Sequence, residues 1–106
     1  MTTEATLDEL ETARAAGAEV LDVRESDEYA EGHVPSARLM PLGIVPVRAH
    51  ELPTGTPVYV ICASGARSAQ AAQILQRVGV DARTVAGGTT AWIRSGRPIE
   101  TGAPRS

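Results

Sequence analysis

The segment from residue 57 to residue 68 combines a strand, a loop and the start of a helix. It has the sequence Pro57-Val58-Tyr59-Val60-Ile61-Cys62-Ala63-Ser64-Gly65-Ala66-Arg67-Ser68. The first six residues form a near-continuous apolar run of strand length, which is typical of a strand buried inside a parallel sheet. Apolar residues then recur with the spacing of one helix face, at Ala71, Ile74, Leu75 and Val78. The segment is therefore predicted to be one strand–loop–helix unit.

The same alternation of short apolar strands and helical patterns continues on both sides of this segment. Further strands are predicted over residues 19–23, 37–40 and 81–86, and helices over residues 7–16, 26–31 and 89–95. This order predicts a single α/β domain. We expect a mostly parallel sheet with helices on both faces and Cys62 at the C-terminal edge of that sheet.

Local signals set the expected ends of several elements. Thr6 and Glu9 form a capping box for the first helix, and Ser26 is the expected N-cap of the second. Pro46 restricts any helix in the mixed segment 44–52 to starting near that residue. The tail after Ile99 is expected to fray.

The length and composition fit one soluble globular domain. The chain has 106 residues, of which 42% are hydrophobic and 22% charged, close to the average for such domains. We expect one domain over residues 1–106, with a core over about 5–100 and a tail over 101–106. No apolar run approaches the ~20 residues of a membrane span, and the N-terminus lacks the stretches of a signal peptide. A cytoplasmic location without membrane contact is expected.

The charged residues exclude several classes of protein. Ten basic and 13 acidic residues give a net charge of −3, without the basic run that a nucleic-acid backbone requires. All ten basic residues are Arg, which excludes Schiff-base, pyridoxal-phosphate and Walker-A chemistry because each needs a lysine. Cys62 is the only cysteine, so an internal disulfide and a CxxC pair are excluded. With only His33 and His50 besides, no metal site is expected.

Cys62 stands where a parallel sheet usually binds ligands, at the C-terminal end of a strand. The small residues that follow allow successive backbone N–H groups to turn inward as an anion-binding nest. The start of the next helix adds a positive dipole end, and Arg67 adds a full charge. Each of these features favours a thiolate over a thiol and makes the cysteine nucleophilic. A lone cysteine at a strand end can also be a small buried hydrophobe, but the Gly, Arg and Ser that follow favour the nucleophile.

Three motifs resemble the single-domain rhodanese-like sulfurtransferases, and together they span about residues 5–100. The N-terminal motif is Leu21-Asp22-Val23-Arg24-Glu25 followed by Tyr29, Gly32-His33-Val34-Pro35 and Ala37. The second is the loop Cys62-Ala63-Ser64-Gly65-Ala66-Arg67-Ser68, and the third comprises Gly87-Gly88, Trp92 and Gly96-Arg97-Pro98. The resemblance implies a three-layer α/β/α domain with a central, mostly parallel sheet of about five strands.

The resemblance also implies a mechanism. The Cys62 thiolate takes a sulfane sulfur from a donor such as thiosulfate and passes it to cyanide or a thiol, possible acceptors including a protein thiol. The loop N–H groups would stabilise the persulfide, and Arg67 would attract the anionic donor. The implied substrate-binding residues are Ala63, Ser64, Gly65, Ala66, Arg67 and Ser68. No metal or organic cofactor is required, and a monomer or weak dimer is expected.

Several other residues have expected supporting roles. Asp22 and Arg24 are expected to form an ion pair that holds the N-terminal motif beside the active loop, and His33 to fix a loop through a hydrogen bond. His50 is expected at the surface and Trp92 in the core or pocket wall. Glu28 stands where two-domain relatives often carry an arginine for the donor, which argues against a high affinity for thiosulfate.

Other functions compete with sulfur transfer. A phosphatase or arsenate reductase on this fold has five residues between Cys and Arg, whereas this chain has four, and the tighter loop suits a single sulfur atom. A non-catalytic binding or regulatory module would not need the cysteine. A persulfide carrier that serves a partner enzyme remains a third alternative, because one domain offers few acceptor contacts.

Overall fold

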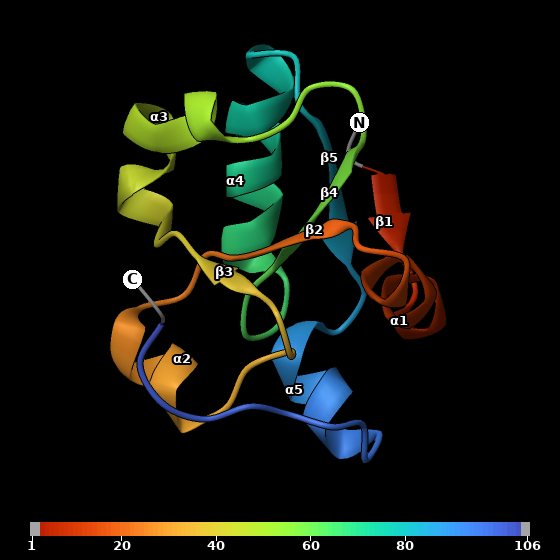
Figure 1. The fold of residues 1–106 in the computed structure, drawn as a ribbon. Helices are drawn as coiled ribbons and strands as arrows, with labels where there is room; N and C mark the ends of the chain where they lie inside the picture. The colour runs from red at the N-terminus through yellow and green to blue at the C-terminus, as the bar shows by residue number, and fades with distance from the viewer. Residues whose placement is uncertain (1–2, 105–106) are drawn as a thin grey trace.

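The computed structural model describes residues 3–104, in which strands and helices alternate along the chain (Figure 1). The strands are β1 (Thr3–Ala5), β2 (Glu19–Asp22), β3 (Arg38–Leu39), β4 (Pro57–Ile61) and β5 (Asp81–Val85). The helices are α1 (Leu7–Ala15), α2 (Ser26–Glu31), α3 (Val45–Arg48), α4 (Ala66–Arg77) and α5 (Gly88–Arg94), and 3₁₀ turns flank α3 at Leu42–Ile44 and Ala49–Glu51.

Within this described part of the chain, the five strands form one parallel sheet in the order β1-β5-β4-β2-β3. The central strand β4 pairs with β2 through Asp22 and Ile61, and with β5 through Val60 and Thr84. Because parallel strands end at the same edge of a sheet, Cys62 lies at the C-terminal edge, directly after β4. The predicted fold class and the position of Cys62 are confirmed, although β1 is absent from the strands predicted individually above.

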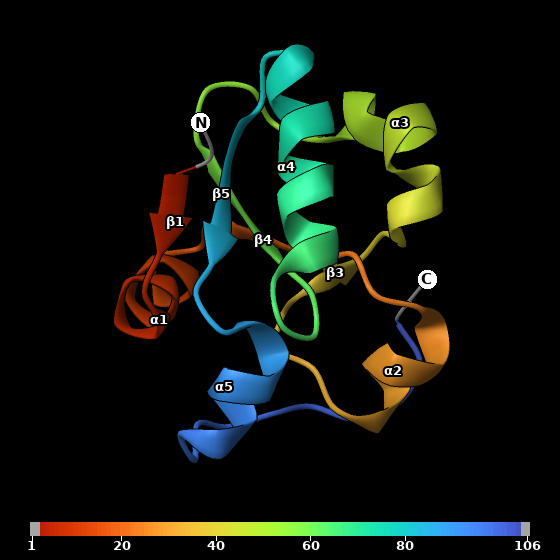
Figure 2. The same ribbon diagram turned by 180° about the vertical axis from the view of Figure 1, so that it is seen from behind.

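Successive side chains of β4 point to opposite faces of the sheet, and helices cover both faces. Val60 and Cys62 belong to a core cluster that includes residues of α3 and α4. Tyr59 and Ile61 belong to a second cluster, which includes residues of α1 and α5. Figure 2 shows α3 and α4 next to each other. The predicted three-layer α/β/α arrangement follows from this alternation.

The predicted helix ends are partly correct. The capping box of α1 is present, with the Glu9 amide donating to the Thr6 hydroxyl at 3.1 Å and the Thr6 amide to the Glu9 carboxylate at 2.9 Å. The N-cap of α2 is Glu25 rather than Ser26, which begins the helix itself. Helix α4 ends at Arg77, so Val78 leaves the apolar stripe and is 56% exposed. These two expectations are wrong by about one residue, the usual uncertainty of helix ends.

The segment after α5 is docked, which corrects the expectation of a frayed tail. His33 and Glu100 exchange two backbone hydrogen bonds of 2.9 Å as an antiparallel bridge. The Gly102 amide donates to a carbonyl of α2 at 2.8 Å. The chain therefore crosses α2 after leaving α5 (Figure 1). Residues 105–106 of the predicted tail lie outside the described residues.

The indole of Trp92 is fully buried and donates a hydrogen bond to the carbonyl of Pro98 at 2.8 Å, which links α5 to this docked segment. Truncation to alanine removes a large buried ring and its hydrogen bond. We expect Trp92→Ala to lower the free energy of unfolding by about 3–5 kcal/mol in urea titrations. Val47→Ala serves as the control, because Val47 is 74% exposed and its truncation should stay within about 0.5 kcal/mol. A loss below about 1 kcal/mol for Trp92→Ala would contradict this account.

Candidate active site

Cys62 is buried, with 1% of its surface exposed, and the loop that follows wraps around its sulfur atom. The Gly65 amide donates a hydrogen bond to Cys62 Sγ at 3.0 Å. Ser68 Oγ lies 3.5 Å from the same sulfur, and the Ser68 hydroxyl donates to the Gly65 carbonyl at 3.0 Å. Gly65 has φ +133°, a backbone conformation that L side chains rarely adopt. The glycine therefore allows the chain to fold its amide back onto the sulfur.

These groups set the protonation state of the thiol. Burial alone raises the pKa of Cys62, because it disfavours the charged form. A hydrogen bond with the Ser68 side chain and hydrogen bonds from the backbone amides of Ser68, Gly65 and Ser64 outweigh it, and the net pKa is lowered. The predicted nest of amides is therefore present and favours the thiolate, the nucleophilic form.

The predicted loop residues differ in how far solvent reaches them. Ser68 is buried, whereas Ala63, Gly65 and Arg67 are half-buried. Ser64 and Ala66 are exposed. The loop therefore places backbone amides around the sulfur and keeps its small side chains at the rim.

The start of α5 holds the loop from the opposite side. The Thr89 and Thr90 amides donate to the carbonyls of Cys62 and Ala63 at 2.8 and 3.1 Å. A Cβ atom on Gly88 would lie 2.5 Å from both of these carbonyl oxygens. Gly88 is thus required because the loop backbone occupies the space that any side chain would fill.

Asp22 and Arg24 form the expected ion pair. Arg24 Nη2 lies 2.8 Å from Asp22 Oδ2, and Arg24 Nε donates to Asp22 Oδ1 at 3.0 Å. Arg24 also donates to the Gly32 carbonyl at 2.9 Å, at the end of α2. The Val23 amide donates to the Ile61 carbonyl, directly before Cys62. The pair therefore ties the end of β2 to α2, next to the strand that carries the cysteine.

His33 has the expected structural role. Its Nδ1 lies 2.7 Å from the Tyr29 carbonyl, and its ring stacks on the Tyr29 ring with centroids 3.6 Å apart. His33 is 4% exposed, whereas His50 is exposed as expected. The stack fixes the turn between α2 and β3.

The guanidinium of Arg67 is paired with a carboxylate, and its expected role in attracting the donor stays a prediction. Its Nη1 and Nη2 donate to the two carboxylate oxygens of Glu28 at 2.7 and 2.9 Å. The hydrogen bond from Arg67 lowers the pKa of Glu28 to about 2, against an opposing effect of burial. In return Glu28 raises the pKa of Arg67. Sequence reasoning singled out both residues but not their contact.

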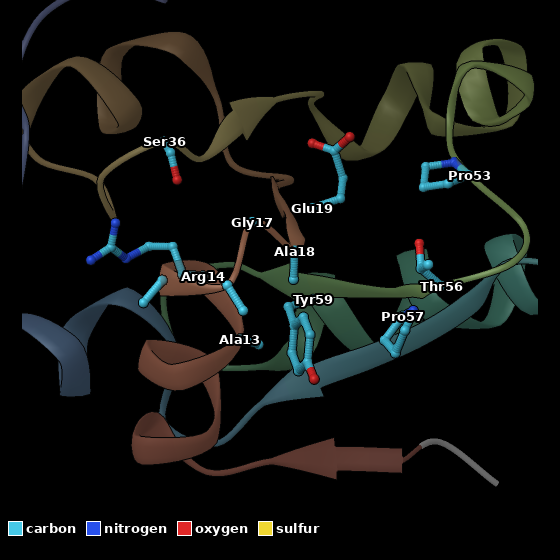
Figure 3. A pocket seen from close by; sticks show the side chains of 12 residues that line it. Ala13, Arg14, Gly17, Ala18, Glu19, Ser36, Pro53, Thr56, Pro57 and Tyr59 are labelled. Carbon is cyan, nitrogen blue, oxygen red and sulfur yellow. The ribbon is translucent and has the colours of Figure 1, made fainter.

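Two surface hollows have linings that include neither Cys62 nor the loop that follows it. One lies between the end of α1 and the starts of β2 and β4, with Arg14, Glu19, Pro57 and Tyr59 in its lining (Figure 3). Another, with Arg38 and Glu100 in its lining, lies between β3 and the docked segment. Because β2 and β4 start at the first hollow and end beside Cys62, that hollow is at the opposite edge of the sheet from the thiol.

The match to known proteins agrees with this geometry. The rhodanese-like domain family matches residues 4–95. The chain belongs to the rhodanese-like family. This rhodanese-like domain is 38% identical to a sulfurtransferase of Allochromatium vinosum over 81 residues, 76% of each chain. It is 37% identical to a thiosulfate sulfurtransferase of Actinobacillus pleuropneumoniae over 86 residues, 80% of each chain.

A solved structure shares the fold of this rhodanese-like domain. The rhodanese-related protein of Thermoplasma volcanium superposes with a TM-score of 0.86 at 31% identity, covering 92% of this chain and 97% of that one. Residues 3–104 bring no three His, Cys, Asp or Glu side chains into a cluster that could hold a metal ion. None of the helices over this range is long and apolar enough to cross a membrane.

The lowered pKa of Cys62 predicts the pH dependence of its alkylation. The iodoacetamide rate of the wild type should rise with pH to a midpoint below ~8.5, the value of a free cysteine. Ser68→Ala removes the side chain whose hydrogen bond with Cys62 lowers the pKa of the thiol, and it should move this midpoint upward. Ser64→Ala is the matched control, because Ser64 contributes its backbone amide, and it should leave the midpoint unchanged. Equal midpoints for Ser68→Ala and wild type would rule out a contribution of the Ser68 hydroxyl to the lowered pKa of Cys62.

The close approach of Gly88 to the loop carbonyls predicts that a side chain there lowers the stability of the protein by more than backbone strain alone would. Gly88→Ala should lower the free energy of unfolding by at least about 2 kcal/mol, since the methyl group meets two carbonyl oxygens. It should also raise the alkylation midpoint of Cys62 by displacing the loop. The control is Gly17→Ala, which has φ +91° but no heavy atom within 4 Å of its Cβ position. Gly17→Ala should cost about 1 kcal/mol and leave the midpoint unchanged; equal effects of the two changes would contradict the proposed contact.

Proposed function

We propose that the protein is a sulfurtransferase of the thiosulfate type, which carries the transferred sulfur as a persulfide on Cys62. The observation that carries this proposal is the buried Cys62 sulfur, which accepts the Gly65 amide at 3.0 Å. An amide donor at this position stabilises negative charge on sulfur in both the thiolate and the persulfide anion. The name of the thiosulfate sulfurtransferase relative supports the same donor.

In the first step the Cys62 thiolate attacks the outer sulfur of thiosulfate. A bond forms between Cys62 Sγ and the outer sulfur, and the bond between that sulfur and the sulfonate sulfur breaks. Sulfite leaves with the bonding electron pair. The outer sulfur keeps the negative charge that it carried in thiosulfate and becomes the terminal sulfur of the new persulfide, where the loop amides can stabilise it.

In the second step an acceptor attacks the terminal sulfur of the persulfide. With cyanide, a carbon–sulfur bond forms, the sulfur–sulfur bond breaks, and Cys62 leaves as the thiolate. The product is thiocyanate. A thiol acceptor reacts in the same way as its thiolate and becomes a persulfide, so a protein thiol is also a proposed acceptor. Neither step requires a metal or an organic cofactor.

The loop geometry disfavours a phosphatase or an arsenate reductase. Four residues separate Cys62 from Arg67, and Gly65 lies close enough for its amide to bond directly to the sulfur. A tetrahedral oxyanion needs room between the thiolate and the amides. Arg67, which would bind such an ion, is already bonded to Glu28.

The proposal predicts that the transferred sulfur becomes bound to the protein, and only at Cys62. Wild type mixed with thiosulfate should gain the mass of one sulfur atom by intact-mass spectrometry, and cyanide should remove it as thiocyanate. Cys62→Ser retains the shape of the side chain but lacks the thiolate, so it should fold normally and show neither the mass gain nor thiocyanate. A Cys62→Ser protein that still transfers sulfur would refute the mechanism.

The same experiment separates the alternatives. A wild type that gains sulfur but yields it only to a thiol would be a persulfide carrier. A wild type that never gains sulfur from thiosulfate or from an organic persulfide would be a binding module, and the proposed activity would be wrong.

A further inference from the structure

The contact between Glu28 and Arg67 joins α2 to the start of α4 beside the sulfur-binding loop. Both N–H groups of the Arg67 fork are bonded to the Glu28 carboxylate, at 2.7 and 2.9 Å. Each side chain is about one-third exposed, at 33% and 32%. This two-point geometry is the one in which a guanidinium also binds an oxyanion such as a sulfonate. Glu28 thus occupies the two Nη groups with which Arg67 could otherwise bind an oxyanion in this way.

Glu28 is held in this position from its own helix as well. Its carboxylate accepts the Glu25 amide at 3.0 Å, which caps α2. The other end of α2 is tied to Arg24 through the Gly32 carbonyl. The Glu28 carboxylate is therefore held by three hydrogen bonds, two from Arg67 and one from the Glu25 amide, unlike a freely rotating surface side chain.

The charge of the pair has a consequence for the donor. The pKa of Glu28 near 2 keeps its carboxylate ionised at every pH at which Cys62 reacts. The pair therefore has no net charge, and the negative oxygen atoms of Glu28 occupy both Nη groups of Arg67. A dianion must either displace this carboxylate or bind beside it, and Coulomb repulsion grows with the charge of the donor.

We propose that Glu28 is a specificity-determining residue, which makes this active site select sulfur donors of low negative charge over the thiosulfate dianion. The donor class that fits is a persulfide on a weakly charged thiol. This inference rests on the proposed function and names its preferred substrate class.

The transfer from such a donor balances without another reactant. The Cys62 thiolate attacks the outer sulfur of the persulfide R–S–SH, and a new sulfur–sulfur bond forms. The original sulfur–sulfur bond breaks and R–S⁻ leaves with the electron pair. The proton stays on the transferred sulfur or is released to solvent, which leaves the persulfide of Cys62.

A charge series of donors tests the proposal in the 106-residue chain. Thiosulfate carries two negative charges, whereas methanethiosulfonate carries one and has a similar leaving group. Glu28→Gln removes the charge but retains an oxygen that can accept the Glu25 amide. We expect the KM for thiosulfate to fall about tenfold and that for methanethiosulfonate about threefold, because the Coulomb energy scales with donor charge. The kcat values should change by less than about twofold.

Two further variants isolate the role of the ion pair. Glu31→Gln removes the same charge from the exposed end of α2 and should leave both KM values within about twofold, since exposed charges are screened. Glu28→Gln combined with Arg67→Gln removes the guanidinium that Glu28 occupies. If Glu28 acts by occupying Arg67, Glu28→Gln should lower the KM for thiosulfate by less than about threefold when Arg67 is already replaced by Gln.

Binding is measured separately from turnover. In the Cys62→Ser background, calorimetry should show that Glu28→Gln binds thiosulfate about tenfold more tightly. Equal affinities, or equal KM changes for the two donors, would overturn the specificity proposal even if the wild type transfers sulfur. A tenfold fall in the KM for thiosulfate that persists when Arg67 is replaced by Gln would refute the proposal that Glu28 acts by occupying the guanidinium. A wild type that transfers sulfur from neither donor would overturn the proposed function, and this inference with it.

Discussion

The two hydrogen bonds from the first amides of α5 to the carbonyls of Cys62 and Ala63 fix the direction of the active-site loop. A peptide group whose carbonyl is held on one side presents its N–H on the other. The loop can therefore direct amides toward the sulfur before any substrate is bound, and this arrangement needs little reorganisation during reaction. The parallel pairing of β4 and β5 supplies the geometry, because it ends both strands at the same edge.

The electrostatics of the site consist of two separate parts. The amides and Ser68 act on the sulfur itself and favour a negative charge there. The Glu28–Arg67 pair acts, in our proposal, on the donor that approaches the sulfur, and the two charges of the pair cancel. A family member can thus retain the machinery that activates the thiol while a single side chain on α2 changes which donors reach it.

Much of the fold could be predicted from the sequence because the decisive signals are local. The apolar run that ends at Cys62 and the spacing of Ala71 and Leu75 specify β4 and α4 without reference to other parts of the chain. β1 could not be predicted in this way because a strand of three residues is too short to show a period in its hydrophobic residues. It is recognised by its pairing with β5. The docking of Glu100 on His33 could not be predicted either, because the two residues are 67 positions apart in the sequence.

The site shows the same division between local and long-range information. Cys62, Gly65 and Ser68 lie within seven residues, so their spacing alone indicates a thiolate held by amides. The ion pair between Asp22 and Arg24 was equally predictable, being two residues apart. The contact of Glu28 with Arg67 spans 39 residues, and only the packing of α2 against the active loop reveals it.

The tight contact at Gly88 also limits how this loop could change in evolution. The backbone of Cys62 and Ala63 is fixed by α5, so an inserted residue there would break the register with Thr89 and Thr90. Beyond Ala63 the constraint is weaker, because the Cβ position of Gly65 has no neighbour within 4 Å. An ancestor or descendant with a wider loop would therefore have gained its extra residue between Ala63 and Arg67, leaving the nucleophile and its anchor in place.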